Sequence, residues 1–107
     1  MPSSVTVLIE YRALPGQVER ALAEIEGLVA TVVSTEPDCL GIRLLQDSAD
    51  PERLLLVERW SSKKTYLGPH RETPHLQAFI AGAAAFLTGP PEIRIWSEHA
   101  EYLPASL

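Results

Sequence analysis

Apolar and polar side chains alternate at the beginning of the chain. Val5, Val7, Ile9 and Tyr11 occupy every second position, and most of the residues between them are polar. A repeat of two residues, rich in β-branched side chains, predicts a strand. The sequence Leu14-Pro15-Gly16 predicts the end of that strand, since proline and glycine together favour a turn.

The next segment repeats its apolar residues at helical spacing. Such a stripe predicts an amphipathic helix with one buried face. Glu36-Pro37-Asp38 predicts its end, because the residue before a proline resists the α conformation. The stripe consists of Val18, Ala21, Leu22, Ile25, Leu28, Val29, Val32 and Val33.

Two further strands are predicted at residues 40–46 and 53–60. The segment 47–52 between them is polar and carries Asp and Pro, which favour turns. Its shortness predicts an antiparallel hairpin. Residues 54–57 form a continuous apolar run, so we expect both faces of this strand to be covered.

The second half of the chain predicts two helices and a last strand. Ser61-Ser62 offers an N-cap for a short helix that ends near Leu67. Thr73-Pro74 begins a longer helix, with proline at a favoured first position, and Gly89-Pro90-Pro91 lies beyond its end. An alternating segment then predicts a strand over residues 93–102. The apolar face of the longer helix comprises Leu76, Phe79, Ile80, Ala83, Phe86 and Leu87.

The order of these elements, β-α-β-β-α-α-β, predicts a ferredoxin-like α+β fold. We expect an antiparallel sheet with the helices on one face, and a single domain over residues 1–107 with its core at about 5–102. One face of the sheet then lacks a helical cover. A second copy packed sheet to sheet would cover it, so we expect a homodimer with a barrel-like core.

Composition and charge narrow the range of partners. The 107 residues carry a formal net charge of −5. This disfavours nucleic acid and anionic membrane, since both are bound by concentrated basic surfaces. Cys39 is the only cysteine, so an internal disulfide is impossible and a thiolate metal site is disfavoured. Neither a signal peptide nor an apolar run of ~20 residues is present, and we expect a cytoplasmic protein.

Candidate chemistry concentrates around the third strand and the helices that follow it. His70 and His75 are candidate bases, because an unperturbed histidine titrates near ~6.5. The structural alternatives are a hydrogen bond to a helix end for His70 and a surface or capping role for His75. His99 is a weaker candidate on the last strand. The five-residue spacing of the first two does not suit a helical metal pair, and no carboxylate completes an evident triad, so we expect no metal.

Three sequence segments resemble one known family. They are Tyr11-Arg12-Ala13 followed by Pro15-Gly16, then Glu58-x-Trp60, and then His70, Thr73-Pro74-His75 and Phe79. Together they resemble the antibiotic biosynthesis monooxygenase family, over nearly the whole chain from Val5 to about Tyr102. The resemblance implies the dimeric α+β barrel fold. The resemblance does not fix the reaction, because the family includes cofactor-free oxygenases of aromatic polyketides or quinols, haem-degrading enzymes and a quorum-signal isomerase.

The resemblance therefore implies a cofactor-independent monooxygenase that oxidises a small aromatic, phenolic or quinol-type substrate with O2. Haem degradation is disfavoured, because Tyr11 and Pro69 stand where the haem-degrading members carry an Asn and a Trp. The alternatives are an isomerase of a small oxygenated metabolite and a non-catalytic dimer that binds a small ligand.

We expect the following roles for the site residues. His70, His75 and Tyr11 are the candidate catalytic residues, with the tyrosine as a hydrogen-bond donor or alternatively as an amphipathic residue at the edge of the core. Trp60 offers a flat face for an aromatic ligand, or alternatively anchors the core or a dimer interface. Glu58 is expected to pair with one of three arginines, and it counts among the substrate-binding candidates. The arginines are Arg43, Arg59 and Arg94, and the substrate-binding candidates are Trp60, Glu58, Arg43 and Phe79.

Overall fold

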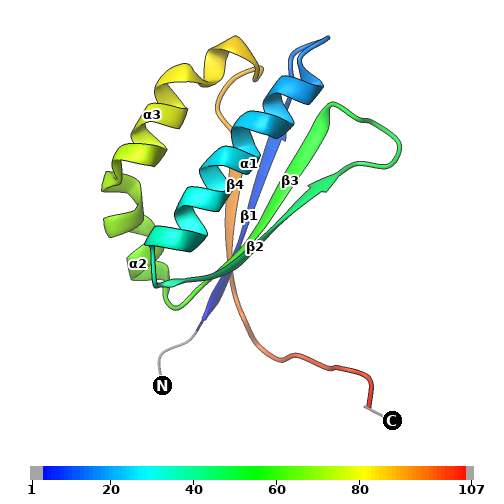
Figure 1. Cartoon of the computed structure of the whole chain (residues 1–107). Coiled ribbons are helices and arrows are strands. Elements are labelled where there is room, and N and C mark those ends of the chain that lie inside the picture. The colour runs from blue at the N-terminus through cyan, green and yellow to red at the C-terminus, as the bar shows by residue number, and fades with distance from the viewer. Residues whose placement is uncertain (1–3, 106–107) are drawn as a thin grey trace.

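An antiparallel sheet in the order β2-β3-β1-β4 forms one layer of the computed structural model, which describes residues 4–105. The helices lie across one of its faces, as Figure 1 shows. This confirms the predicted ferredoxin-like α+β arrangement. Its elements are β1 (Val5–Arg12), α1 (Val18–Thr35), β2 (Cys39–Gln46), β3 (Arg53–Trp60), α2 (Lys63–Leu67), the 3₁₀ helix η1 (Pro69–Glu72), α3 (Pro74–Gly82), the 3₁₀ helix η2 (Ala83–Ala85) and β4 (Glu92–Ser97).

The two central strands place alternate side chains on the helical face of the sheet. Val7 pairs with Glu58 and Ile9 with Leu56, so these four side chains point to the same side. All four are buried. The intervening residues of both strands, such as Val57, point to the opposite face, which has no helix on it. In a single copy of the chain, the second face of β3 is therefore only half-covered.

The helix α1 closes the core above the sheet. Ala21, Ile25 and Val32 are its buried residues, and they follow the predicted apolar stripe. A turn with Pro15 and then Gly16 connects β1 to this helix. Gly16 has a φ of 77°, a conformation that glycine adopts without a steric cost.

The predictions for the later elements are partly confirmed. The strand over 53–60 is confirmed, and of the two serines predicted as candidate N-caps, Ser62 caps α2 through a hydrogen bond of 3.2 Å from the Thr65 amide to Ser62 Oγ. The last strand, predicted to reach residue 102, ends at Ser97. Ser97 pairs with Val5, the first residue of β1, so the ladder between the two strands ends there, and Glu98 is held by a hydrogen bond from its amide to the Ser4 carbonyl and by its side chain.

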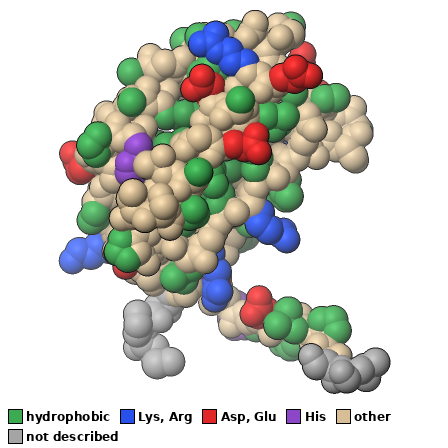
Figure 2. Space-filling model, in the orientation of Figure 1, with side chains coloured by type: hydrophobic (Ala, Val, Ile, Leu, Met, Phe, Trp, Pro, Cys, Tyr) green, Lys and Arg blue, Asp and Glu red, His purple; other side chains and the backbone are tan. Residues whose placement is uncertain are grey.

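The helix α3 differs from the prediction in both length and packing. It ends at Gly82 and continues as a 3₁₀ turn, and none of its residues is fully buried. Ile80 is 57% exposed. Figure 2 shows hydrophobic side chains reaching the surface between the helices of this face. The apolar side of α3 thus does not fill the space above the sheet, and it leaves a cavity.

No helix among residues 4–105 combines the length and the apolar character that a membrane crossing requires.

Candidate active site

A cavity of about 520 Å³ lies between the sheet and its helical cover. Its floor comes from β1 and β3, its walls come from α1 and α3, and the loop before β4 closes one end. Most of the lining is apolar, which excludes competing water from much of the space. Residues that represent the apolar part are Ile9, Leu28, Leu56, Leu76, Phe79 and Leu87.

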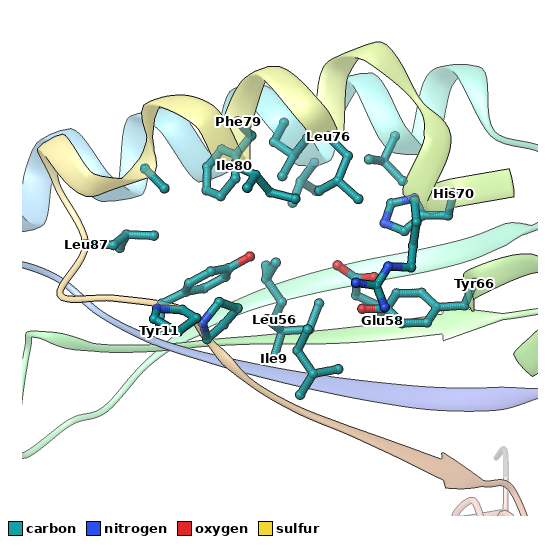
Figure 3. A pocket seen from close by; sticks show the side chains of 18 of the residues that line it. Ile9, Tyr11, Leu56, Glu58, Tyr66, His70, Leu76, Phe79, Ile80 and Leu87 are labelled. Carbon is teal, nitrogen blue, oxygen red and sulfur yellow. The ribbon is translucent and has the colours of Figure 1, made fainter. Parts of the chain in front are cut away.

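Polar side chains gather at one end of this cavity. Glu58, Tyr66 and His70 lie there, while Phe79 and Leu87 lie towards the other end (Figure 3). Tyr11 approaches from the sheet, and its hydroxyl points to the middle of the space. The cavity therefore suits a flat apolar ligand that carries oxygen atoms at one end.

His70 is held by a carboxylate that lies far away in the sequence. Glu36 Oε1 and Oε2 lie 2.9 and 3.1 Å from His70 Nδ1, and Glu36 Oε2 lies 2.6 Å from His75 Nε2. Glu36 is the C-cap residue of α1, whereas the histidines belong to η1 and α3. One carboxylate thus joins three elements of the helical cover.

These contacts indicate which nitrogen of each imidazole carries a hydrogen. An ionised carboxylate only accepts hydrogen bonds, so each nitrogen that contacts Glu36 carries a hydrogen. In a neutral His70 the hydrogen is then on Nδ1, and Nε2 keeps its lone pair. Among the described residues none bonds to Nε2, and His70 lines the cavity. His70 thus combines a free basic nitrogen with a carboxylate behind it.

Aromatic rings fix the plane of the His70 imidazole. Tyr66 stacks on it at 5.2 Å between ring centroids with an interplanar angle of 24°, and Trp60 lies at 4.6 Å with an angle of 53°. His70 itself is only 4% exposed. With the Glu36 bonds, these contacts leave the ring little freedom to rotate.

Glu58 is the second ionisable group inside the cavity. Its Oε1 accepts a hydrogen bond of 2.9 Å from Trp60 Nε1. Burial raises the pKa of Glu58 to about 7, although the Trp60 bond opposes this shift and the charge of Glu36 adds to it. A carboxyl group with such a pKa can accept or donate a proton near neutral pH.

The two tyrosines of the cavity remain neutral donors. Burial, with the charge of Glu58, raises the pKa of Tyr11 far above its ordinary value and that of Tyr66 to about 12. The Tyr11 ring also packs edge-on against Phe79, at 6.0 Å between centroids. Tyr11 can therefore donate a hydrogen bond from a fixed position to a ligand oxygen.

The structure brings together most, but not all, of the candidate residues. Tyr11, Glu58, His70 and Phe79 line the cavity. His75 contributes through Glu36 rather than directly. Trp60 is 1% exposed and lies beneath His70, which agrees with the core alternative.

Arg43 does not join the other candidates. It pairs with Val57 and so points to the opposite face of the sheet, where it lines another groove. The predicted arginine partner of Glu58 is wrong, because the partner is Trp60. The other two candidate arginines bind carboxylates elsewhere, Arg59 that of Glu98 and Arg94 that of Glu92.

Sequence reasoning missed Glu36, Tyr66 and Arg71. No carboxylate evident in the sequence completes a triad with the histidines, whereas in the structure Glu36 binds both. One signal was present, because an acidic residue at the C-terminal end of a helix opposes the helix dipole and needs a compensating partner. Among residues 4–105, no cluster of three or more His, Cys, Asp or Glu is arranged to hold a metal ion.

The raised pKa of Glu58 has a consequence for stability. The folded chain binds this proton more tightly than the unfolded chain, whose carboxyl keeps its ordinary value of 4.5. The proton on Glu58 therefore stabilises the folded state fully below pH 4.5, and this stabilisation is lost as the pH rises through about 7. We expect Glu58→Gln, which cannot ionise, to gain up to about 3 kcal/mol in unfolding free energy relative to wild type between about pH 4.5 and 8.

Urea unfolding at one fixed protein concentration measures this difference. Glu24→Gln is the control, because Glu24 is exposed on α1. Parallel pH profiles for wild type and Glu58→Gln would show that burial does not perturb this carboxyl group.

Comparisons with known proteins agree with this fold. PA3566 from Pseudomonas aeruginosa superimposes with a TM-score of 0.82 at 29% identity, covering 94% of this chain and 98% of its own. Rv0793 from Mycobacterium tuberculosis superimposes with a TM-score of 0.80 at 23% identity, covering 92% of this chain and 98% of its own. A conserved protein from Methanosarcina mazei superimposes with a TM-score of 0.81 at 19% identity, covering 92% of this chain and 95% of its own.

A search of the curated proteins gives no significant match. The family model described as "Antibiotic biosynthesis monooxygenase" matches residues 4–82. The chain therefore belongs to the antibiotic biosynthesis monooxygenase family.

Proposed function

We propose that the protein is a cofactor-independent monooxygenase that oxidises a small phenolic or quinol-type aromatic with O2. The observation that carries the proposal is the buried His70, whose Nδ1 is bound by Glu36 while its ring borders an apolar cavity. Such chemistry needs a base, a dry space and donors for an oxyanion. Family membership supports an oxygenase but leaves the substrate open.

The reaction begins with a proton transfer. His70 Nε2 takes the proton of the substrate hydroxyl, and the imidazolium is stabilised by Glu36 on the far side of the ring. The electron-rich anion then passes one electron to O2, giving an organic radical and superoxide. Their recombination forms a carbon–oxygen bond and a peroxide anion, which the His70 imidazolium protonates. If the carbon that carries the hydroperoxide also bears a hydrogen, loss of water from it leaves a ketone. One oxygen atom of each O2 then becomes the ketone oxygen, and the other becomes water.

Two other groups hold the substrate oxygen during these steps. Tyr11 donates its hydroxyl hydrogen, and the raised pKa of Glu58 keeps a fraction of this carboxyl protonated near neutral pH, so that it donates as well. Phe79 packs against Tyr11 and forms part of the wall for the ring. In this proposal Trp60 acts through Glu58 and His70 rather than by stacking on the ligand.

One observation also favours an isomerase. Glu58 and His70 line the same cavity, so one could remove a proton from a ligand and the other could return it. Turnover without O2 would distinguish this alternative from the oxygenase. A ligand that binds but is never converted would indicate the non-catalytic alternative.

Oxygen uptake by the pure protein with anthrones and hydroquinones tests the proposal. We expect a rate above buffer, and a loss of roughly 100-fold or more in kcat/KM for His70→Gln, the usual contribution of a general base. Glu36→Gln should lose less, because it weakens the support of the base and leaves the base in place. His99→Gln is the control, since His99 is exposed and outside the cavity. No uptake with any of these compounds, or full activity of His70→Gln, would contradict the oxygenase.

We also propose that the open face of the sheet packs against a second copy. By the strand register this face carries Leu8, Leu45, Leu55, Val57 and Trp96. Trp96 is 56% exposed in the single chain. A row of apolar side chains of this kind is typical of an interface.

Sedimentation velocity measures the association. We expect about twice the chain mass of 11.8 kDa for wild type. Trp96→Glu should shift the protein to the monomer, because it places a charge in the apolar interface. Val33→Glu should not, since Val33 is exposed on α1, away from this face. A wild-type monomer at all concentrations would exclude the dimer.

A further inference from the structure

The polar end of the cavity also contains a cation. Arg71 follows His70 directly in η1 and lines the same cavity. His70 is buried whereas Arg71 is exposed, so η1 directs one side chain inward and leaves the other at the rim. Arg71 is the only lysine or arginine among the lining residues, and Glu58 is the only acid.

The backbone at Arg71 is fixed on both sides. Its amide donates to the Gly68 carbonyl at 3.1 Å, and its carbonyl accepts a hydrogen bond of 2.6 Å from Gln77 Nε2. The neighbouring His70 is tied to Glu36. The guanidinium therefore extends from a rigid support, which reduces the entropy lost when it binds a ligand.

The charge of Arg71 acts on the polar end of the cavity. Burial raises the pKa of Tyr66, and the positive charge of Arg71 opposes that rise. Within residues 4–105, Arg71 forms no ion pair, whereas Arg12, Arg53, Arg59 and Arg94 each bind at least one carboxylate. Its hydrogen-bonding capacity is thus free for a ligand.

We propose that Arg71 selects substrates that carry a carboxylate, so that the preferred class is the planar hydroxyaromatic carboxylic acids. A guanidinium binds a carboxylate through two parallel hydrogen bonds. The assignment of the hydroxyl to His70 rests on the proposed function, and the recognition of the carboxylate by Arg71 does not. A single cation matches a monoanion, whereas a phosphate would bring nearly two negative charges into a cavity with no further lysine or arginine.

Binding without turnover tests this selectivity. Titration calorimetry under argon compares 1-hydroxy-2-naphthoate with 1-naphthol, which lacks the carboxylate. The measurement is made at about pH 6, where the Glu58 carboxyl, with its pKa of about 7, is mostly neutral. We expect wild type to bind the naphthoate roughly tenfold more tightly than naphthol, because a hydrogen bond to a charged group contributes about this much affinity.

Arg71→Gln should remove this advantage and leave the affinity for naphthol unchanged. Lys63→Gln is the charge-matched control, because Lys63 is an exposed cation on α2 that does not line the cavity, and it should keep the full preference. Equal affinities of wild type for the two ligands would overturn the proposal. Failure of wild type to bind the naphthoate would also overturn it, as would an Arg71→Gln variant whose affinities for naphthoate and naphthol fall equally. Naphthoate binding that is lost in Arg71→Gln, together with no oxygen uptake from any of the aromatic compounds tested, would contradict the oxygenase and still support the role of Arg71.

Discussion

The carboxylate of Glu36, shared between His70 and His75, is the interaction on which the site depends. It connects the end of α1 to η1 and α3, whose histidines lie 34 and 39 residues further along the chain. Because α3 has no fully buried residue, the apolar contacts of this helix alone hold it weakly to the sheet. The hydrogen bonds to Glu36 supply a specific attachment, and the same bonds orient the imidazole that borders the cavity.

The cavity is left open where the helical cover carries small side chains. Small residues follow one another at the end of α3 and in η2, and they leave space that large side chains would fill. The polar groups enter this space at one end only. A ligand bound there would thus have its oxygen atoms near a base and donors, while its ring lies against apolar walls. In such an environment, charge that develops on the ligand is affected strongly by the few polar groups present.

The sequence predicted the fold well, because the fold follows from local periodicity. The strand over 53–60 and the Ser62 cap depend on neighbouring residues, and both are confirmed. The predictions of the site from the sequence were less complete, because the site depends on contacts between segments that lie far apart in the chain. Tyr11 and His70 lie at the cavity as expected, but Glu36 carries no periodic signal that indicates its partners.

Strand register explains the misplacement of Arg43. Whether this side chain faces the helices depends on its pairing with Val57 and on the irregularity between Cys39 and Gly41. A shift of one residue would reverse the face. Neither the register nor the irregularity can be read from the alternation of residues in a single strand.

The tautomer of His70 tests the central claim most directly. Nitrogen NMR of protein labelled at histidine distinguishes the two ring nitrogens, before and after addition of a phenol that resists oxidation. The Glu36 contact requires hydrogen on Nδ1 of the neutral ring, with an unprotonated Nε2 whose signal shifts when the phenol binds. Hydrogen on Nε2 with a bare Nδ1, or an Nε2 signal that does not respond to a bound phenol, would contradict the account.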